Sequence, residues 1–191
     1  MNTYNPYYQQ RIEHTVDLAL QAHPRTLVLR VDLRLPGIPA SSDAAVISRF
    51  TESLKAKIRA HQLRKHQQGL CVHRTTLRYV WVKEVGPMSG KRHYHALLLL
   101  NKDAWCTPGD YQSATSLAGL IKQAWCSALR LNYADYATLV HFPVDPALWV
   151  DSNSPDYITQ RTAVTVRASY LAKDFSKCYG GGERSFGCSM G

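Results

Sequence analysis

The decisive stretch of the sequence is Lys91-Arg92-His93-Tyr94-His95-Ala96-Leu97-Leu98-Leu99-Leu100-Asn101, in which two histidines stand one residue apart at the head of an apolar run. The run is apolar at odd and even positions alike, which predicts an interior strand of a sheet, covered on both faces. Side chains at i and i+2 of a strand leave the same face, with Cα atoms about 6.5–7 Å apart. His93 and His95 are therefore placed to bind one ion together, although a single histidine there is more often just a polar residue near a strand end.

Length and charge limit the class of protein. A chain of 191 residues suits one domain with a full hydrophobic core. Lys and Arg outnumber Asp and Glu by 23 to 14, and the sequence pI is about 9.4. A positive field of this size favours a polyanionic partner, most commonly nucleic acid. A basic protein without such a partner is the alternative.

Membrane and disulfide classes are not indicated. No apolar run approaches the ~20 residues needed to span a bilayer, and the polar, tyrosine-rich N-terminus lacks the order of a signal peptide. We therefore expect no membrane partner and a cytoplasmic location. The five cysteines are odd in number and include no Cys-x-x-Cys pair, so we expect free thiols.

Hydrophobic periodicity and turn residues predict an alternation of strands and helices. In the first half of the chain we expect a short helix ending near residue 24, a strand at 27–35, a helix from about 45 to 66, and strands at 75–85 and 91–101. Ser41, Ser42 or Asp43 can cap the helix at 45–66. In the second half we expect a helix at about 111–131, a strand at 137–144, a loop at 146–155, a helix at about 162–177 and a glycine-rich stretch over the surface at 180–187. This order predicts an α+β fold, a single-domain α/β sandwich with a central antiparallel sheet. Within it we expect an N-terminal lead at 1–24, the main domain at 25–179 and a tail at 180–191.

The strand at 27–35 alternates apolar residues with Arg30, Asp32 and Arg34, which predicts one wet face. On that face the two arginines and the aspartate meet either a phosphate backbone or solvent. Arg49, Lys55, Lys57, Arg59, Arg64 and Lys65 make the following helix basic, which fits a solvated face or a face that lies along DNA.

The turn composition at 86–90 predicts a hairpin between the strands at 75–85 and 91–101. If Gly86 pairs with Lys91, Glu84 stands opposite His93, and a slip of one residue would send Glu84 to the other face. Glu84, His93 and His95 then form a two-imidazole, one-carboxylate set that suits a divalent ion open to substrate. Mg²⁺ or Mn²⁺ fits a phosphate substrate best, and zinc would bind such ligands too.

A second candidate for chemistry is Tyr170-Leu171-Ala172-Lys173, which places a phenol and an ammonium on neighbouring positions of a predicted helix. A phenol with an ordinary pKa near 10 is a poor nucleophile at neutral pH. A metal that polarises the target phosphate and a nearby cation such as Lys173 would lower the barrier. Taken alone, the pattern is usually structural.

The combination of a glutamate, a downstream His-hydrophobe-His strand and a later Tyr-x-x-Lys resembles the HUH endonucleases of rolling-circle replication. More narrowly, the sequence resembles the replication initiators of filamentous phages, the inovirus gene-two product family, and the YagK/YfjJ C-terminal domain family. The matching parts are the segments 27–35, 81–101, 169–177 and 184–187.

The resemblance implies an RRM/ferredoxin-like HUH endonuclease fold and a protein that nicks one strand at an origin, holds the 5′ phosphate on tyrosine and can rejoin the strand. It implies His93 and His95 as the metal pair with Glu84 as a looser third ligand, Tyr170 as the nucleophile and Lys173 as its helper. The basic residues expected to contact DNA are Arg30, Arg34, Lys91, Arg92 and Lys177.

The partner implied is single-stranded or supercoiled origin DNA in the cytoplasm of a bacterial host. The chain has no Gly-x-x-x-x-Gly-Lys-Ser/Thr motif, so strand separation and synthesis would fall to a host helicase and polymerase. Two other classes stay open, a non-enzymatic DNA-binding protein and a metal-dependent phosphodiester hydrolase that uses activated water. Tyr170→Phe separates the three, since only the first needs the phenol.

Overall fold

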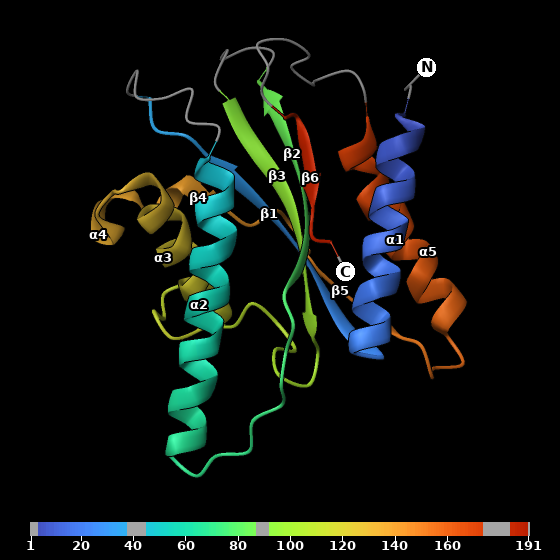
Figure 1. Cartoon of the computed structure of the whole chain (residues 1–191), viewed down its shortest axis with the longest axis horizontal. Coiled ribbons are helices and arrows are strands. Elements are labelled where there is room, and N and C mark those ends of the chain that lie inside the picture. Colours follow the sequence, from blue (N-terminus) through green and yellow to red (C-terminus); the bar gives the residue numbers. More distant parts are fainter. Residues whose placement is uncertain (1–3, 38–44, 87–91, 174–183, 191) are drawn as a thin grey trace.

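The computed structural model describes residues 4–37, 45–86, 92–173 and 184–190. The elements in chain order are α1 (Pro6–Ala22), β1 (Arg25–Arg34), α2 (Val46–Gln67), β2 (Arg78–Val85), β3 (Arg92–Asn101), α3 (Leu117–Leu129), α4 (Tyr133–Tyr136), η1 (Ala137–Leu139), β4 (Val140–His141), β5 (Ala147–Asp151), α5 (Tyr157–Ser169), η2 (Tyr170–Ala172) and β6 (Phe186–Cys188). The predicted α+β class is confirmed, as Figure 1 shows. None of the helices in these ranges combines the length and the apolar character that crossing a membrane requires.

The sheet is antiparallel and is built around β3. Its strand order is β4-β1-β3-β2-β6, and β5 pairs with the other half of β1. β3 pairs with β1 along one edge and with β2 along the other, so residues 93–99 of the histidine strand have a neighbour on both sides. The predicted interior position of this strand is confirmed.

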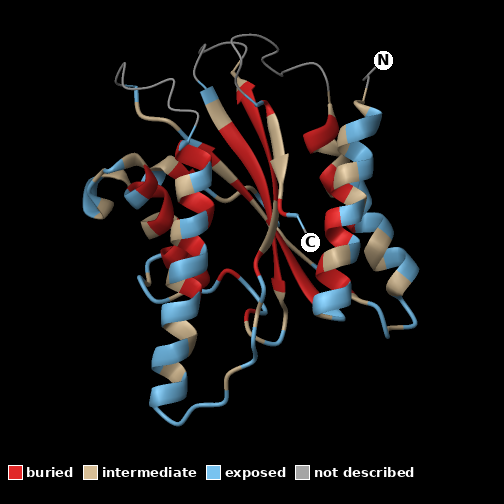
Figure 2. Ribbon diagram, viewed as in Figure 1, coloured by how far each residue is buried: buried red, intermediate tan, exposed pale blue. Residues whose placement is uncertain are grey.

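Helices cover both faces of the sheet and enclose two separate apolar cores (Figure 2). One face packs against α2 and α3 and takes Leu98 and Leu100 from β3. The other face packs against α1 and α5 and takes Leu97 and Leu99. Each of these four leucines is at most 1% exposed. Because both faces of β3 are covered, apolar residues occupy odd and even positions of the strand alike. Full burial of such a side chain contributes roughly 1.5–3 kcal/mol.

The predicted hairpin register is confirmed. Glu84 pairs with His93, and Val82 pairs with His95. Because residues directly opposite each other share a face, the glutamate and both histidines project from the face that carries α1 and α5. The carboxylate therefore reaches the imidazoles without any rearrangement of the backbone.

The prediction of a wet face on the first strand holds only at its end, where Arg34 is exposed. Val28 is 2% exposed in the core under α1 and α5, and the side chains of Arg30 and Asp32 are only 17% and 16% exposed. The alternation of charged and apolar residues reflects instead a face that is buried at one end and polar at the other, where the histidines lie.

Three further boundaries in the middle of the chain differ from the sequence prediction. The helix expected at 111–131 begins only at Leu117, where the Ser116 side chain caps it by accepting the Gly119 N–H. The strand expected at 137–144 is reduced to β4 by the short helix η1. The expected loop at 146–155 contains β5, because the edge of β1 offers backbone groups that this segment pairs with.

The chain end also differs. Residues 180–183 of the glycine-rich stretch lie outside the described residues, whereas the end of the stretch enters β6, which pairs with β2 and forms an edge of the sheet. The last helix spans Tyr157–Ser169 rather than about 162–177. The chain continues as η2, whose Ala172 carbonyl accepts the Asn5 N–H at 2.8 Å. The expected cap residues Ser41, Ser42 and Asp43 lie outside the described residues, as do Lys91 and Lys177. Cys71, Cys106, Cys126 and Cys188 are free, as expected.

Candidate metal centre

Glu84, His93 and His95 converge at the polar end of the face that carries α1 and α5. The two Nε2 atoms of the histidines lie 3.1 Å apart. Glu84 Oε2 lies 3.2 Å from His95 Nε2 and 4.0 Å from His93 Nε2. Within the described residues this is the group of His, Cys, Asp and Glu side chains whose ligand atoms lie close enough together to hold a metal ion.

The donor set fits a divalent ion. Two ligand atoms bound to one metal at about 2.1 Å lie about 3.0 Å apart in octahedral geometry and about 3.4 Å apart in tetrahedral geometry. The distance between the two Nε2 atoms, 3.1 Å, and that between Glu84 Oε2 and His95 Nε2, 3.2 Å, fall within this range. His93 makes the widest separation and is the most exposed of the three, at 24% against 7% for His95 and 4% for Glu84. Three protein ligands leave coordination positions for substrate or water, as a catalytic site requires.

Asp32, predicted from the sequence to meet solvent or a phosphate backbone, lies instead directly behind this centre. It pairs directly with His95 across β1 and β3, and its Oδ1 accepts the His95 Nδ1–H at 2.6 Å. That bond places a proton on Nδ1, so Nε2, which faces Glu84 and His93, is the nitrogen that can bind a metal. His141 on β4 also faces Asp32, with Nδ1 at 3.5 Å from Oδ2. The one available signal in the sequence was an aspartate between two arginines in an apolar strand.

The electrostatics of this pair follow from burial and hydrogen bonding. Burial lowers the pKa of His95, but its hydrogen bonds to Asp32 and Glu84 outweigh burial, so the pKa is raised. Burial raises the pKa of Asp32, but its bond to His95 and the charges of His95 and Arg30 outweigh burial, so the pKa is lowered. Asp32 is therefore a carboxylate that holds its histidine in place.

The structure places Tyr170 beside the centre. Its ring centroid lies 5.4 Å from that of His95 in an edge-on arrangement. The Arg30 guanidinium stands 4.5 Å and the Lys173 ammonium 4.8 Å from the centroid of the tyrosine ring. The predicted proximity of the phenol and the ammonium is confirmed, though Tyr170 lies in the short helix η2 and Lys173 has extended backbone. The structure thus brings Tyr170, Lys173 and Arg30 together next to the histidines.

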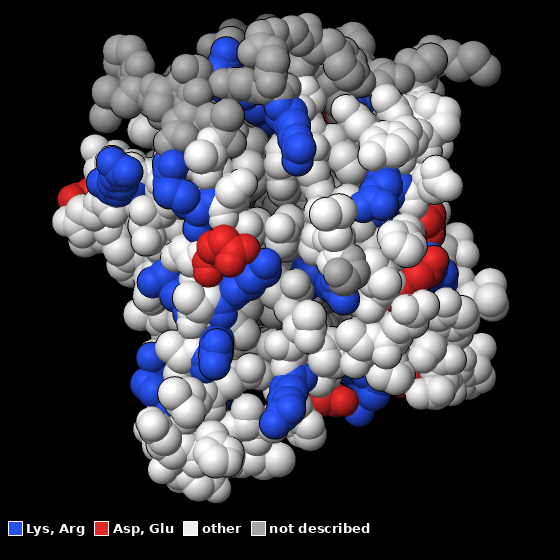
Figure 3. Space-filling model, viewed as in Figure 1, with Lys and Arg blue, Asp and Glu red and all other residues white. Residues whose placement is uncertain are grey.

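Arg34 and Arg92 line a cleft of ≈ 400 Å³ where β1 ends and β3 begins. Asp32, His93 and His95 also line it, so the cleft leads from solvent to the centre between two guanidinium groups. Basic side chains outnumber acidic ones over the face of the molecule seen in Figure 3. The cleft has the size and charge to admit a phosphodiester.

By its fold and its site, the chain is an α+β protein with a candidate metal-binding group on the central antiparallel hairpin. The chain belongs to the YagK/YfjJ C-terminal domain family, whose model matches residues 2–189, and the expected membership of that family is confirmed. It is similar to the uncharacterized protein YagK of Escherichia coli strain K12, with 41% identity over 192 residues that cover 96% of this chain and 92% of the relative. It is also similar to the uncharacterized protein YfjJ of the same strain, with 33% identity over 202 residues that cover 96% and 94%. No solved structure gives a significant match.

Proposed function

We propose that the protein is a metal-dependent, site-specific endonuclease of the HUH type, related to the inovirus gene-two initiators. It nicks single-stranded origin DNA and rejoins it through a covalent bond to Tyr170. The observation that carries the proposal is the position of Tyr170, whose ring lies 5.4 Å from that of His95. A tyrosine from the far end of the chain thus lies beside the histidine strand, which supports a role as the nucleophile in addition to its packing against the core.

Each residue has a distinct task in this reaction. Glu84, His93 and His95 hold the ion, Mg²⁺ or Mn²⁺, which supplies neutralisation of charge on the scissile phosphate. Asp32 keeps His95 in the tautomer that binds metal. Arg34 and Arg92 line the entrance and position the flanking phosphates. Arg30 and Lys173 flank the phenol and favour negative charge there in the transition state.

The reaction is a transesterification. The Tyr170 oxygen forms a bond to phosphorus while the bond from phosphorus to the 3′ oxygen breaks. The phenolic proton leaves, and the 3′ oxygen takes up a proton as the free 3′-OH. One phosphodiester has replaced another, so the reverse attack by a 3′-OH restores the strand without ATP. A host polymerase extends the free 3′-OH, and a host helicase separates the strands.

A labelled single strand from the origin of the protein's own genetic element, incubated with the protein and Mn²⁺, tests the proposal. A denaturing gel should show a DNA–protein adduct that Tyr170→Phe abolishes and that His95→Ala reduces by at least about a hundredfold. Tyr157→Phe is the matched control, since Tyr157 lies at the opposite end of α5, and it should leave the adduct unchanged.

Two other results would replace the proposal. Cleavage without an adduct, undiminished by Tyr170→Phe, indicates hydrolysis by activated water. Tight binding of origin DNA with neither adduct nor cleavage indicates a non-enzymatic DNA-binding protein.

A further inference from the structure

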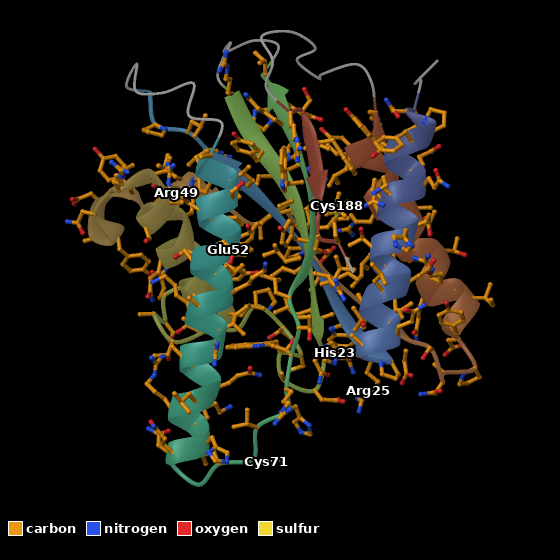
Figure 4. All side chains as sticks on the ribbon, viewed as in Figure 1. His23, Arg25, Arg49, Glu52, Cys71 and Cys188 are labelled. Atoms are coloured by element: carbon orange, nitrogen blue, oxygen red, sulfur yellow. The ribbon has the colours of Figure 1, made fainter. Side chains whose placement is uncertain are left out.

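A second cleft lies on the same face of the sheet, between α1 and the edge strand β6. It measures ≈ 440 Å³, and its lining consists of Tyr7, Tyr8, Arg11, Arg184, Ser185, Phe186, Gly187, Cys188 and Met190. This lining contains three aromatic rings and two arginines but no carboxylate. Cys188, labelled in Figure 4, lies at the side of β6 that faces α1, and its Sγ accepts a hydrogen bond from Arg11 Nη2 at 3.2 Å.

The aromatic rings form a stepped platform. Tyr8 stacks on Phe186 with ring centroids 4.2 Å apart and planes 8° from parallel. Tyr7 stands 6.1 Å from Tyr8 at an angle of 56° and is 61% exposed. The stacked pair also packs against the core under α1, which fixes its orientation. The exposed Tyr7 has no such role in packing, and an exposed ring of this size beside arginines is suited to stacking on a flat, electron-rich ligand.

The elements that form the cleft are linked to those of the candidate metal centre. Phe186 pairs with Val82, so it shares a face with Glu84, two residues further along β2. β6 lies two strand spacings from β3, which amounts to about 10 Å. On the other side, the Asn5 N–H donates to the Ala172 carbonyl at 2.8 Å, which ties the start of α1 to the short helix that carries Tyr170. Both walls of the cleft are thus attached to elements of the centre.

We propose that this cleft is a subsite for single-stranded nucleic acid, in which Tyr7 stacks on a base and Arg11 and Arg184 contact the adjoining phosphates. Stacking platforms combined with basic side chains are the usual means of binding single strands without base-specific contacts. The two arginines and the absence of a carboxylate in the lining match an anionic partner. The subsite rests on the proposed function in that it would hold the strand that leads to or from the scissile phosphate.

Binding in EDTA tests the subsite apart from nicking, because no metal is then present. The probe is a fluorescein-labelled oligothymidine of about 12 nucleotides, within the size range of single-strand sites, and the measurement is fluorescence anisotropy at a fixed salt concentration. Tyr7→Ala should weaken binding about tenfold, and Tyr7→Phe should restore it to within about twofold, as expected for the loss and return of a stacking ring. Tyr111→Ala is the matched control, since Tyr111 is an exposed tyrosine outside the cleft, and it should not change the affinity.

Two more arms separate stacking from charge. An abasic strand of the same length should bind wild-type protein and Tyr7→Ala equally, because it has no base to stack. Arg184→Ala should weaken the binding of both strands and reduce the salt dependence. Photocrosslinking with 4-thiothymidine should join the strand to a residue of the cleft.

The subsite is refuted if Tyr7→Ala and Arg184→Ala bind oligothymidine as tightly as wild type. It is equally refuted if Tyr7→Ala dissociates a dimer without changing DNA affinity, since the cleft would then face a second copy of the chain. The binding assay and the nicking assay can fail separately. If Tyr7→Ala weakens binding but no adduct forms, the subsite is supported and the nuclease is refuted. If an adduct forms and Tyr7→Ala does not affect it, the nuclease is supported and the subsite is refuted.

Discussion

The Nδ1–H of His95 donates a hydrogen bond of 2.6 Å to Asp32 Oδ1, across the pairing of β3 with β1. A carboxylate behind a histidine orients the ring and increases the basicity of the nitrogen that binds metal. Asp32→Asn removes the negative charge while preserving size. We expect the affinity for Mn²⁺, measured by isothermal titration calorimetry, to fall about 10–100-fold.

The control for this experiment is Asp110→Asn, which changes an exposed aspartate in a loop and should leave Mn²⁺ binding unchanged. Equal affinities of wild type and Asp32→Asn would show that the hydrogen bond does not support the centre.

Metal binding should stabilise the folded chain. A ligand at about a hundred times its Kd adds about 2.7 kcal/mol to the free energy of unfolding, which for a chain of this length raises Tm by about 5–10 °C. Differential scanning calorimetry with and without Mn²⁺ should show this shift in wild type and in His14→Ala, which alters an exposed histidine of α1. His95→Ala should abolish the shift, and a shift that survives in this variant would place the ion elsewhere.

The pKa of His23 predicts a loss of stability in mild acid. Burial, followed by the charge of Arg78, lowers the pKa of His23, and its Nε2 accepts the Thr76 N–H at 2.8 Å. The unfolded chain therefore binds a proton more readily than the folded chain, so the contribution is present above about pH 6.5 and is lost as the pH falls below that value. In urea titrations from neutral pH to about pH 5.5, the stability difference between wild type and His23→Ala should shrink. A difference that stays constant or grows would contradict this assignment.

Gly119 in α3 is expected to tolerate no side chain. A Cβ there would lie 2.2 Å from the carbonyl oxygen of Ser113, and a backbone atom cannot rotate out of the way as a side chain can. Gly119→Ala should therefore lower the free energy of unfolding by about 1–3 kcal/mol despite the better helix propensity of alanine. Ser127→Ala, on the exposed side of the same helix, should change it by less than about 0.5 kcal/mol. Urea unfolding followed by tryptophan fluorescence measures both.

Local chemistry was enough to predict the hairpin that carries the centre. The turn composition at 86–90 set the pairing of the two strands, and alternation then placed Glu84 on the face of His93 and His95. The apolar run after His95 predicted coverage on both faces, which two cores provide. These features depend on residues close together in the chain, where strand geometry leaves few alternatives.

Contacts between distant segments were not predictable in this way. Asp32 reads as a surface residue in its own strand, and only the pairing of β1 with β3, 63 positions away in the chain, turns it toward His95. The position of η2 beside the start of α1 depends on the hydrogen bond between Asn5 and Ala172. β5 and β6 are too short to show a pattern of their own and form because the outer edges of β1 and β2 need partners.

The sequence by itself determined the α+β class, the interior histidine strand and the carboxylate opposite it, because strand alternation and turn chemistry act over a few residues. Only the tertiary structure decided that Asp32 stands behind His95, that Tyr170 lies beside the same imidazole and that Tyr8 stacks on Phe186. Each of these contacts joins residues more than 60 positions apart, and their meeting depends on how helices and strands pack rather than on any local preference of the chain.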